Sequence, residues 1–373
     1  MNFRFGEQEE AFRAEVRRFL EPWRDLDGYF AQGQRWPRVA QLFREMAARG
    51  WLALAWPERC GGLGGGPALE YLLWDEVAYA RAARNPLAAG IVARTLVRCG
   101  SAAQQARWLP PIRSGALHFS LAYSEPEAGS DLASLRTRAV RDGDDYLIDG
   151  QKCWQSYAQD MDCFWLLART GAQESRGAGL SLFICEKERP GVTLRPLPTL
   201  DGDQLNEVRF EGVRVPAEQR VGPEHGAWKI MAEALADERH IQFPPGRLRR
   251  DLEEMVDWVR GAGLAGDAVV RRTLADLAVR VDEAEMHALI VLDAMQKGRP
   301  AAAEAAANKV VHTQVCQEIA RAVVELGGPE ALVTGSRPEL LYRQSMWETI
   351  GGGTSEVMRG VVAKQALGLG GRS

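Results

Sequence analysis

The chain has 373 residues, of which 46% are hydrophobic and 26% charged, a composition typical of a globular protein with two or three structural units. Its 46 basic and 50 acidic residues leave a net charge of −4, which argues against nucleic-acid binding. No stretch reaches the roughly 18 apolar residues of a membrane span, and the polar start has no secretory signal, so the sequence predicts a cytoplasmic protein without a membrane span.

Helical periodicity dominates residues 1–115. Apolar residues recur at intervals of three and four near the start, at Phe5, Phe12, Val16 and Leu20. Further helical stretches are predicted at 37–50, 68–81, 86–99 and 102–113. The glycine cluster at 61–66 neither follows a clear strand nor opens a βαβ unit, so it is interpreted as a turn rather than a dinucleotide-binding loop.

The pattern changes to short strands over residues 116–225. These runs are rich in β-branched and aromatic residues and are separated by glycine, aspartate and proline. The dipeptides Asp142-Gly143 and Asp149-Gly150 stand at hairpin spacing. We therefore expect a middle domain built as an antiparallel β-barrel or sandwich.

Helical patterns return over residues 226–373, with long stretches predicted at 247–260, 267–296 and 300–327. The predicted fold class is α+β: an N-terminal helical domain (1–115), a middle β domain (116–225) and a C-terminal helical bundle (226–373).

Several classes of site are disfavoured. The six cysteines contain no CxxC pair and the five histidines no HExxH spacing, so we expect reduced thiols and no metal site. A GxSxG nucleophile elbow is also missing from the sequence, which disfavours a serine hydrolase.

Three segments resemble signatures of the acyl-CoA dehydrogenase family. Residues 121–132 read LAYSEPEAGSDL, similar to the family's strand and TEPxAGSD loop. Residues 149–154, DGQKCW, resemble NGxKxWIT, and residues 353–359, GTSEVMR, resemble GTxEIxR. They occur in family order, each in the matching block of the chain. The resemblance implies an FAD flavoprotein, usually a tetramer, that dehydrogenates the Cα–Cβ bond of an acyl thioester. An electron-transfer flavoprotein is the expected electron acceptor, with oxygen as the alternative.

This reaction needs a base for the α-proton and an acceptor for the β-hydride, which the resemblance assigns to flavin N5. The resemblance also implies a set of cofactor-binding residues: Tyr123, Ser124, Gly129, Ser130, Trp154, Ser156, Gly327, Gly328, Thr354 and Glu356. Ordinary turn chemistry remains an alternative for Ser124 and Ser130, and core packing for Trp154.

The base is where the chain departs from many relatives. They carry a glutamate directly before the Gly-Thr of the last motif, whereas this chain has Gly352. Members resembling the long-chain and isovaleryl branches carry the base in a Glu-Arg pair on the first C-terminal helix, which matches Glu238-Arg239. We therefore predict Glu238, Arg239 and Gly352 as catalytic residues, with Gly352 offering only its backbone N–H. The predicted substrate contacts are Ser130, Arg239, Gly351, Gly352 and Gly353.

A second departure affects the cofactor contacts that the family makes across a subunit interface. The segment 258–264 lacks the family's Phe-Gly, and Val324 stands where a glutamine is expected. Arg260, Arg271 or Arg272 could compensate. Both a homotetramer and a heterotetramer, each a dimer of dimers, therefore stay open. Two other readings of the chain also stay open: a partner subunit that has lost part of its site, and a flavin monooxygenase or oxidase. The thioester could be carried by CoA or by a carrier protein.

Overall fold

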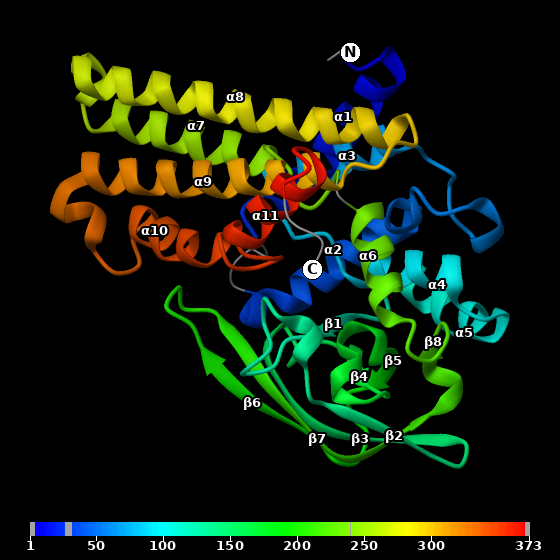
Figure 1. Cartoon of the computed structure of the whole chain (residues 1–373). Helices are drawn as coiled ribbons and strands as arrows, with labels where there is room; N and C mark the ends of the chain where they lie inside the picture. The colour runs from blue at the N-terminus through cyan, green and yellow to red at the C-terminus, as the bar shows by residue number, and fades with distance from the viewer. Residues whose placement is uncertain (1–3, 27–31, 239, 370–373) are drawn as a thin grey trace. The chain divides into compact units, whose positions relative to one another are not determined.

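The computed structural model describes residues 4–26, 32–238 and 240–369 (Figure 1). The chain forms two compact units. One, called here the helical unit, combines Met1–Phe30, Gly66–Arg84 and Arg239–Ser373. The other, called the sheet unit, combines Ala31–Gly65 and Asn85–Glu238. Neither unit is continuous in sequence, because their segments alternate along the N-terminal third of the chain.

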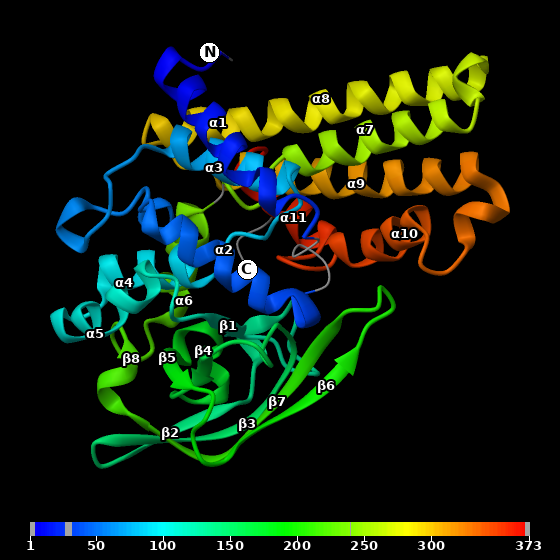
Figure 2. The ribbon, with the colours of Figure 1, turned by 180° about the vertical axis from the view of Figure 1, so that it is seen from behind.

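The helical unit contains α1 (Glu7–Leu20), α3 (Pro67–Tyr79), α7 (Gly246–Gly261), α8 (Ala268–Gln296), α9 (Ala302–Gly327), α10 (Arg337–Glu348) and α11 (Ser355–Gln365). The long helices α7, α8 and α9 lie side by side in Figure 1 and in Figure 2. Their shared core includes Leu248, Met255, Val281, Val315 and Ile319, all almost fully buried. Burial of these apolar side chains stabilises the bundle.

The sheet unit contains α2 (Gln32–Ala48), α4 (Ala93–Cys99), α5 (Ala102–Arg113) and α6 (Ala227–Asp237) around one sheet. Its strands are β1 (Phe119–Ala122), β2 (Arg138–Asp142), β3 (Asp145–Ser156), β4 (Cys163–Arg169), β5 (Leu180–Glu186), β6 (Val192–Pro198), β7 (Gln204–Pro216) and β8 (Arg220–Val221). The strand order is β6-β7-β3-β2-β4-β5-β8, and β1 also pairs with β4. Figure 2 shows β6, β7, β3 and β2 as one curved surface.

The predicted α+β fold class, with helical parts around a middle sheet, is confirmed. One detail differs, because the sheet is mixed rather than wholly antiparallel. Strand β1 pairs with β4 in parallel from Phe119 opposite Cys163 to Ala122 opposite Leu166. It arrives from α5 and leaves into the loop after Ala122, so no tight hairpin forces it to run antiparallel to its neighbour.

The stretch predicted as one helix at 86–99 holds a second difference. Residues Ala88–Val92 form a π-helical turn ahead of α4. The Val92 N–H donates to the Leu87 carbonyl, five residues back, at 3.1 Å. All five residues of the turn are buried. π-Helical turns are uncommon in proteins, and those that occur are often found at functional sites.

The compact units follow other boundaries, because the positions near residues 115 and 225 both lie inside Asn85–Glu238 of the sheet unit. Within the N-terminal part of the chain, α2 belongs to the sheet unit, whereas α1 and α3 belong to the helical unit. The division into domains 1–115, 116–225 and 226–373 stays a prediction. Over the described ranges 4–26, 32–238 and 240–369, none of the helices is long and apolar enough to cross a membrane.

Candidate active site

A buried ion pair joins two of the motif segments in the sheet unit. The Lys152 ammonium on β3 lies 2.9 Å from Glu125 Oε1 and donates to the Tyr123 carbonyl, also at 2.9 Å. The Glu125 carboxylate accepts the backbone N–H groups of Arg136 and Thr137 at 2.7 and 2.9 Å. Lys152 and Glu125 are both buried. These bonds fix the loop that follows β1 against β3.

The pKa values of this pair follow from burial and mutual attraction. Burial opposes the ionised form of Glu125, but the charge of Lys152 and the hydrogen bonds outweigh it and lower the pKa of the carboxyl. Burial lowers the pKa of Lys152 to about 8, because it outweighs the attraction of Glu125. Sequence reasoning gave neither residue a role. The available signal was a lysine between buried positions of a predicted strand, since a buried lysine is almost always paired with a carboxylate.

Trp154 occupies an irregular point in β3. The pairing of β3 with β7 shifts register between Lys152 and Gln155, so Trp154 lies in a β-bulge. Its φ is +64°, a left-handed conformation that is unusual for a bulky residue. The side chain is 49% exposed. Strained backbone of this kind clusters at ligand sites, where it directs a side chain toward a ligand.

The other predicted cofactor residues of the sheet unit are close to this bulge in the chain. The Ser124 carbonyl accepts the Cys153 N–H at 2.9 Å, which links the loop after β1 to the residue before Trp154. Gly129 and Ser130 are on that loop, with Ser130 exposed, and Ser156 is exposed at the end of β3. Among the described residues other than Gly129 and its two chain neighbours, no atom lies within 4 Å of where a Gly129 side chain would begin. The loop therefore leaves room for close approach of a ligand to its backbone.

These features of the sheet unit fit an FAD group. An exposed indole on a strained bulge offers a flat apolar face to an aromatic ring system. The open backbone at Gly129 and the exposed hydroxyls of Ser130 and Ser156 offer hydrogen-bonding groups beside it.

The predicted base, Glu238, also belongs to the sheet unit. It follows the last residue of α6 and is 3% exposed. A Cβ built on Gly90, in the π-turn, would lie 1.6 Å from Glu238 Oε1 and 3.2 Å from Asn85 Nδ2. The Glu238 carboxylate therefore fills the place that a side chain at position 90 would take. Arg239, predicted beside it, lies outside the described residues.

Tyr123 links Glu238 to the cofactor motif. Burial raises the pKa of the Tyr123 hydroxyl well above its usual value, a hydrogen bond with Trp165 partly offsets this, and the negative charge of Glu238 adds to the rise. Tyr123, Glu238 and Gly90 all belong to the sheet unit, and Glu238 Oε1 occupies the place of a Gly90 side chain.

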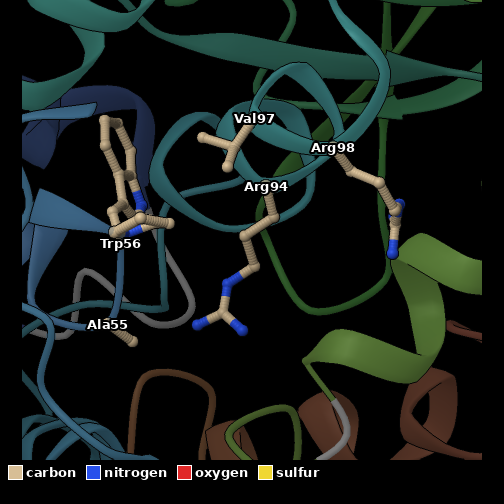
Figure 3. Close-up of a pocket in the computed structure, with 6 residues that line it drawn as sticks. Ala55, Trp56, Arg94, Val97 and Arg98 are labelled. Atoms are coloured by element: carbon tan, nitrogen blue, oxygen red, sulfur yellow. The ribbon is translucent and has the colours of Figure 1, made fainter. Parts of the chain in front are cut away.

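A pocket opens along the helix that continues from the π-turn (Figure 3). It has a volume of about 180 Å³ and is lined by Ala55, Trp56, Pro57, Arg94, Val97 and Arg98. In Figure 3 the Arg94 side chain extends from α4 into the space beside Trp56 and Ala55. The buried Trp56 indole donates to the Ala89 carbonyl of the π-turn at 3.0 Å. One wall of the pocket is thereby bonded to the turn on which Glu238 lies.

The remaining predicted residues belong to the helical unit. Gly351, Gly352 and Gly353 form the loop between α10 and α11, and Gly352 and Gly353 have φ values of +69° and +93°. Such values strain any other residue, so this loop conformation depends on glycine. Immediately before the loop, the Thr349 carbonyl accepts the Lys309 ammonium at 3.0 Å and the Ser355 N–H at 2.9 Å. Lys309, on α9, is 1% exposed and was not recognised from the sequence.

The last motif forms a helix start. The Thr354 hydroxyl accepts the Val357 N–H at 3.2 Å and caps α11. Glu356 is exposed in the first turn, and hydrogen bonds with its own backbone N–H and with Thr354 lower its pKa. An acidic residue is favourable there because the helix N-terminus carries partial positive charge.

The end of α9 carries the other departures from the family pattern. Gly327 and Gly328 end this helix, and the half-buried Val324 lies one turn before them. Arg260 is exposed at the end of α7 and pairs with Asp257 of its own helix at 3.2 Å. The apolar Val324 side chain offers no amide to a cofactor, and the Arg260 charge is engaged within its own helix.

Three family models match successive parts of the chain: the N-terminal domain of acyl-CoA dehydrogenase over residues 6–116, its middle domain over 120–213 and its C-terminal domain over 225–367. This chain belongs to the acyl-CoA dehydrogenase family. The resemblance read from the three motifs is confirmed.

Similar acyl-CoA dehydrogenases include two from Mycobacterium tuberculosis. Acyl-CoA dehydrogenase FadE26 is 35% identical, with 99% of each chain covered, and acyl-CoA dehydrogenase FadE29 is 33% identical, with 89% of this chain and 88% of the relative covered. Among solved structures, the Tcur3481-Tcur3483 steroid ACAD matches with a TM-score of 0.92 at 32% identity, over all of both chains. The ChsE4-ChsE5 complex from Mycobacterium tuberculosis matches with a TM-score of 0.90 at 33% identity, again over all of both chains.

The chain is accordingly an acyl-CoA dehydrogenase-like oxidoreductase that acts on CH–CH groups. Acyl-CoA dehydrogenases are FAD flavoproteins, and the residues of the sheet unit described above fit that cofactor.

Proposed function

We propose that this acyl-CoA dehydrogenase removes the α-proton of an acyl-CoA with the Glu238 carboxylate. The supporting observation is the position of Glu238, buried after α6 with its carboxylate on Gly90 and its charge acting on Tyr123. The family's other base position is Gly352, which has no side chain to take a proton. The C–H bond breaks, its proton moves to Glu238, and the electron pair stays on the thioester as an enolate.

The chain's other groups orient the thioester and stabilise its charge. The Gly352 N–H is proposed to donate to the thioester carbonyl, where negative charge develops. Its loop is held by Lys309 through the Thr349 carbonyl at 3.0 Å. Bound FAD supplies the acceptor for the hydride that leaves the β-carbon. Arg239 and Ser130 are proposed substrate contacts, and an electron-transfer flavoprotein is the proposed acceptor of the electrons.

Replacing the base tests this proposal directly. Glu238→Gln keeps the size of the side chain but removes its basicity, so exchange of the substrate's α-hydrogen for deuterium in D₂O is expected to fall about a hundredfold or more. Mass spectrometry of acyl-CoAs measures this exchange, and the flavin absorption spectrum of the variant controls for cofactor binding. Wild-type exchange in the variant would remove Glu238 from the reaction. Rapid consumption of oxygen by the reduced enzyme would instead favour the oxidase or monooxygenase alternative.

We further propose that this chain works with a second, different chain that completes its cofactor site. Val324 has no amide and Arg260 pairs with Asp257, so two contacts of the family pattern are missing. The solved relatives with TM-scores of 0.92 and 0.90 are the Tcur3481-Tcur3483 steroid ACAD and the ChsE4-ChsE5 complex, each named for two components. We propose accordingly a heterotetramer and a bulky, steroid-like acyl-CoA rather than a carrier-protein thioester.

The cofactor content of the chain expressed alone tests the two-chain proposal. We expect less than one FAD for each chain, measured from the absorption spectrum and the released flavin, and recovery of FAD with a co-expressed homologous chain. A full complement of FAD in the chain alone would support a homotetramer. Steroid-side-chain, branched and straight-chain acyl-CoAs, compared by kcat/KM, and the matching carrier-protein thioesters test the substrate.

A further inference from the structure

The π-turn beside Glu238 presents a glycine at the point where the carboxylate lies. Val92 N–H bonds to the Leu87 carbonyl at 3.1 Å, so the turn is wider than an α-helical turn. The turn is held from outside its helix by Trp56, whose indole donates to the Ala89 carbonyl at 3.0 Å. Thr95 adds a bond from its hydroxyl to the Ile91 carbonyl at 2.6 Å. The turn is therefore a fixed and buried surface.

The contact between Gly90 and Glu238 is too close for any side chain. A Cβ at position 90 would lie 1.6 Å from Glu238 Oε1 and 2.7 Å from its Cδ, far inside van der Waals contact. The backbone itself does not require glycine, because Gly90 is not among the glycines with positive φ. Glycine is needed here for space, and the group that uses the space is the carboxylate of the proposed base.

We propose that Gly90 is a positioning residue for the reaction: the open face of the π-turn is the seat of the Glu238 carboxylate, and the size of residue 90 sets where the base points. This inference rests on the proposed role of Glu238 as base. Glu238 is the C-cap residue of α6, and its φ of −113° lies outside the helical range, so regular helix geometry does not by itself set the direction of its side chain. Contact with the turn then fixes the carboxylate oxygen, and a displacement of about 1 Å is enough to cost up to a hundredfold in rate.

The added methyl of Gly90→Ala would meet the far end of a flexible side chain. Glu238 can therefore rotate away and the chain can fold. Alanine also has a higher helix propensity than glycine, by about 1 kcal/mol, which offsets part of the cost of moving the carboxylate, and the thermal midpoint of each variant checks the fold. The matched control is Gly261→Ala, at the end of α7, where no described atom outside the adjoining backbone of that helix lies within 4 Å of the new Cβ.

The test uses the FAD-loaded enzyme, with its partner chain if one is required, and reads α-hydrogen exchange in D₂O under anaerobic conditions. Gly90→Ala is expected to slow exchange tenfold to a hundredfold and to lower kcat more than it raises KM, whereas Gly261→Ala changes neither. The flavin spectrum should stay that of the wild type. In the Glu238→Asp background, where the carboxylate is one methylene shorter, Gly90→Ala should cost much less.

The outcomes separate this inference from the proposed function. The proposed role of Gly90 would be wrong if Gly90→Ala slowed α-hydrogen exchange equally in the wild-type and Glu238→Asp backgrounds, or did not slow it in the wild-type background. A crystal structure of Gly90→Ala with the Glu238 carboxylate unmoved would also overturn it. Unchanged exchange in Glu238→Gln would instead overturn Glu238 as base, whatever Gly90→Ala does.

Discussion

Two almost fully buried lysines, one in each unit, show different ways of holding a functional loop. Lys152 in the sheet unit and Lys309 in the helical unit are 0% and 1% exposed, and each donates to a backbone carbonyl beside a motif loop, that of Tyr123 and that of Thr349. Lys152 also pairs directly with Glu125 at 2.9 Å. For Lys309 the carboxylates of Glu348 and Glu356 raise the pKa only through their charge, and burial outweighs them.

The two lysines differ in how many groups each anchor involves, and this difference predicts how much stability each anchor contributes. The loop after β1 is anchored at a carboxylate side chain that also accepts two backbone N–H groups, so its anchor is a network. The glycine loop before α11 is anchored through backbone groups: the Thr349 carbonyl accepts the Lys309 ammonium at 3.0 Å, and the Gly351 N–H donates to the Trp347 carbonyl at 3.1 Å. Removing one member of a buried network leaves its partners unpaired and costs much unfolding free energy, whereas removing a single hydrogen bond to a carbonyl costs less.

Breaking the network should have the largest effect. Lys152→Met removes one partner of a buried ion pair and leaves Glu125 charged and buried, which costs about 3–5 kcal/mol of unfolding free energy. Urea unfolding and FAD retention measure the loss. Adding Glu125→Gln should restore part of the stability, because no unpaired charge then remains. A loss under about 1 kcal/mol in Lys152→Met would contradict the network.

Breaking the simpler anchor should have a smaller effect. Lys309→Met removes one charge-assisted hydrogen bond to the Thr349 carbonyl, which is expected to cost about 1.5–3 kcal/mol. We expect a lower kcat, because the loop that carries Gly352 loses its fixed position, and steady-state kinetics with urea unfolding measure both. Lys364→Met, on the exposed end of α11, is the control. Equal losses in both variants would remove Lys309 from this role.

The pH dependence of Lys152 should give the smallest effect. Its pKa is about 8 in the folded chain and 10.5 as the ordinary value, so the unfolded chain binds more protons between these pH values. Its contribution to stability is therefore present above the unfolded pKa and is lost as pH falls through the folded pKa. From pH 7.5 to 8.5 the difference in unfolding free energy between wild type and Lys152→Met should grow by less than about 1.4 kcal/mol. A difference that shrinks over this range would contradict the sign.

Most of the fold and part of the candidate site could be predicted from local sequence patterns. The helices predicted at 267–296 and 300–327 are found at Ala268–Gln296 and Ala302–Gly327, because long apolar periodicity and turn residues mark both ends. The π-turn was missed, because a turn with one extra residue has the same kinds of residue as the α-helix around it. Lys152 and Lys309 were missed because their partners are 27 and 40 residues away in the chain, and the neighbouring residues do not identify those partners.

The π-turn also constrains how this helix can change in length. A π-turn holds one residue more than an α-helical turn, so deleting one residue within Ala88–Val92 would restore regular winding and place a different residue opposite Glu238. A bulkier residue could then face Glu238 while the composition stayed nearly the same. The frame of this helix, and not only the glycine in it, is therefore part of the chemistry, and a sequence alignment of relatives must place its gaps here with that in mind.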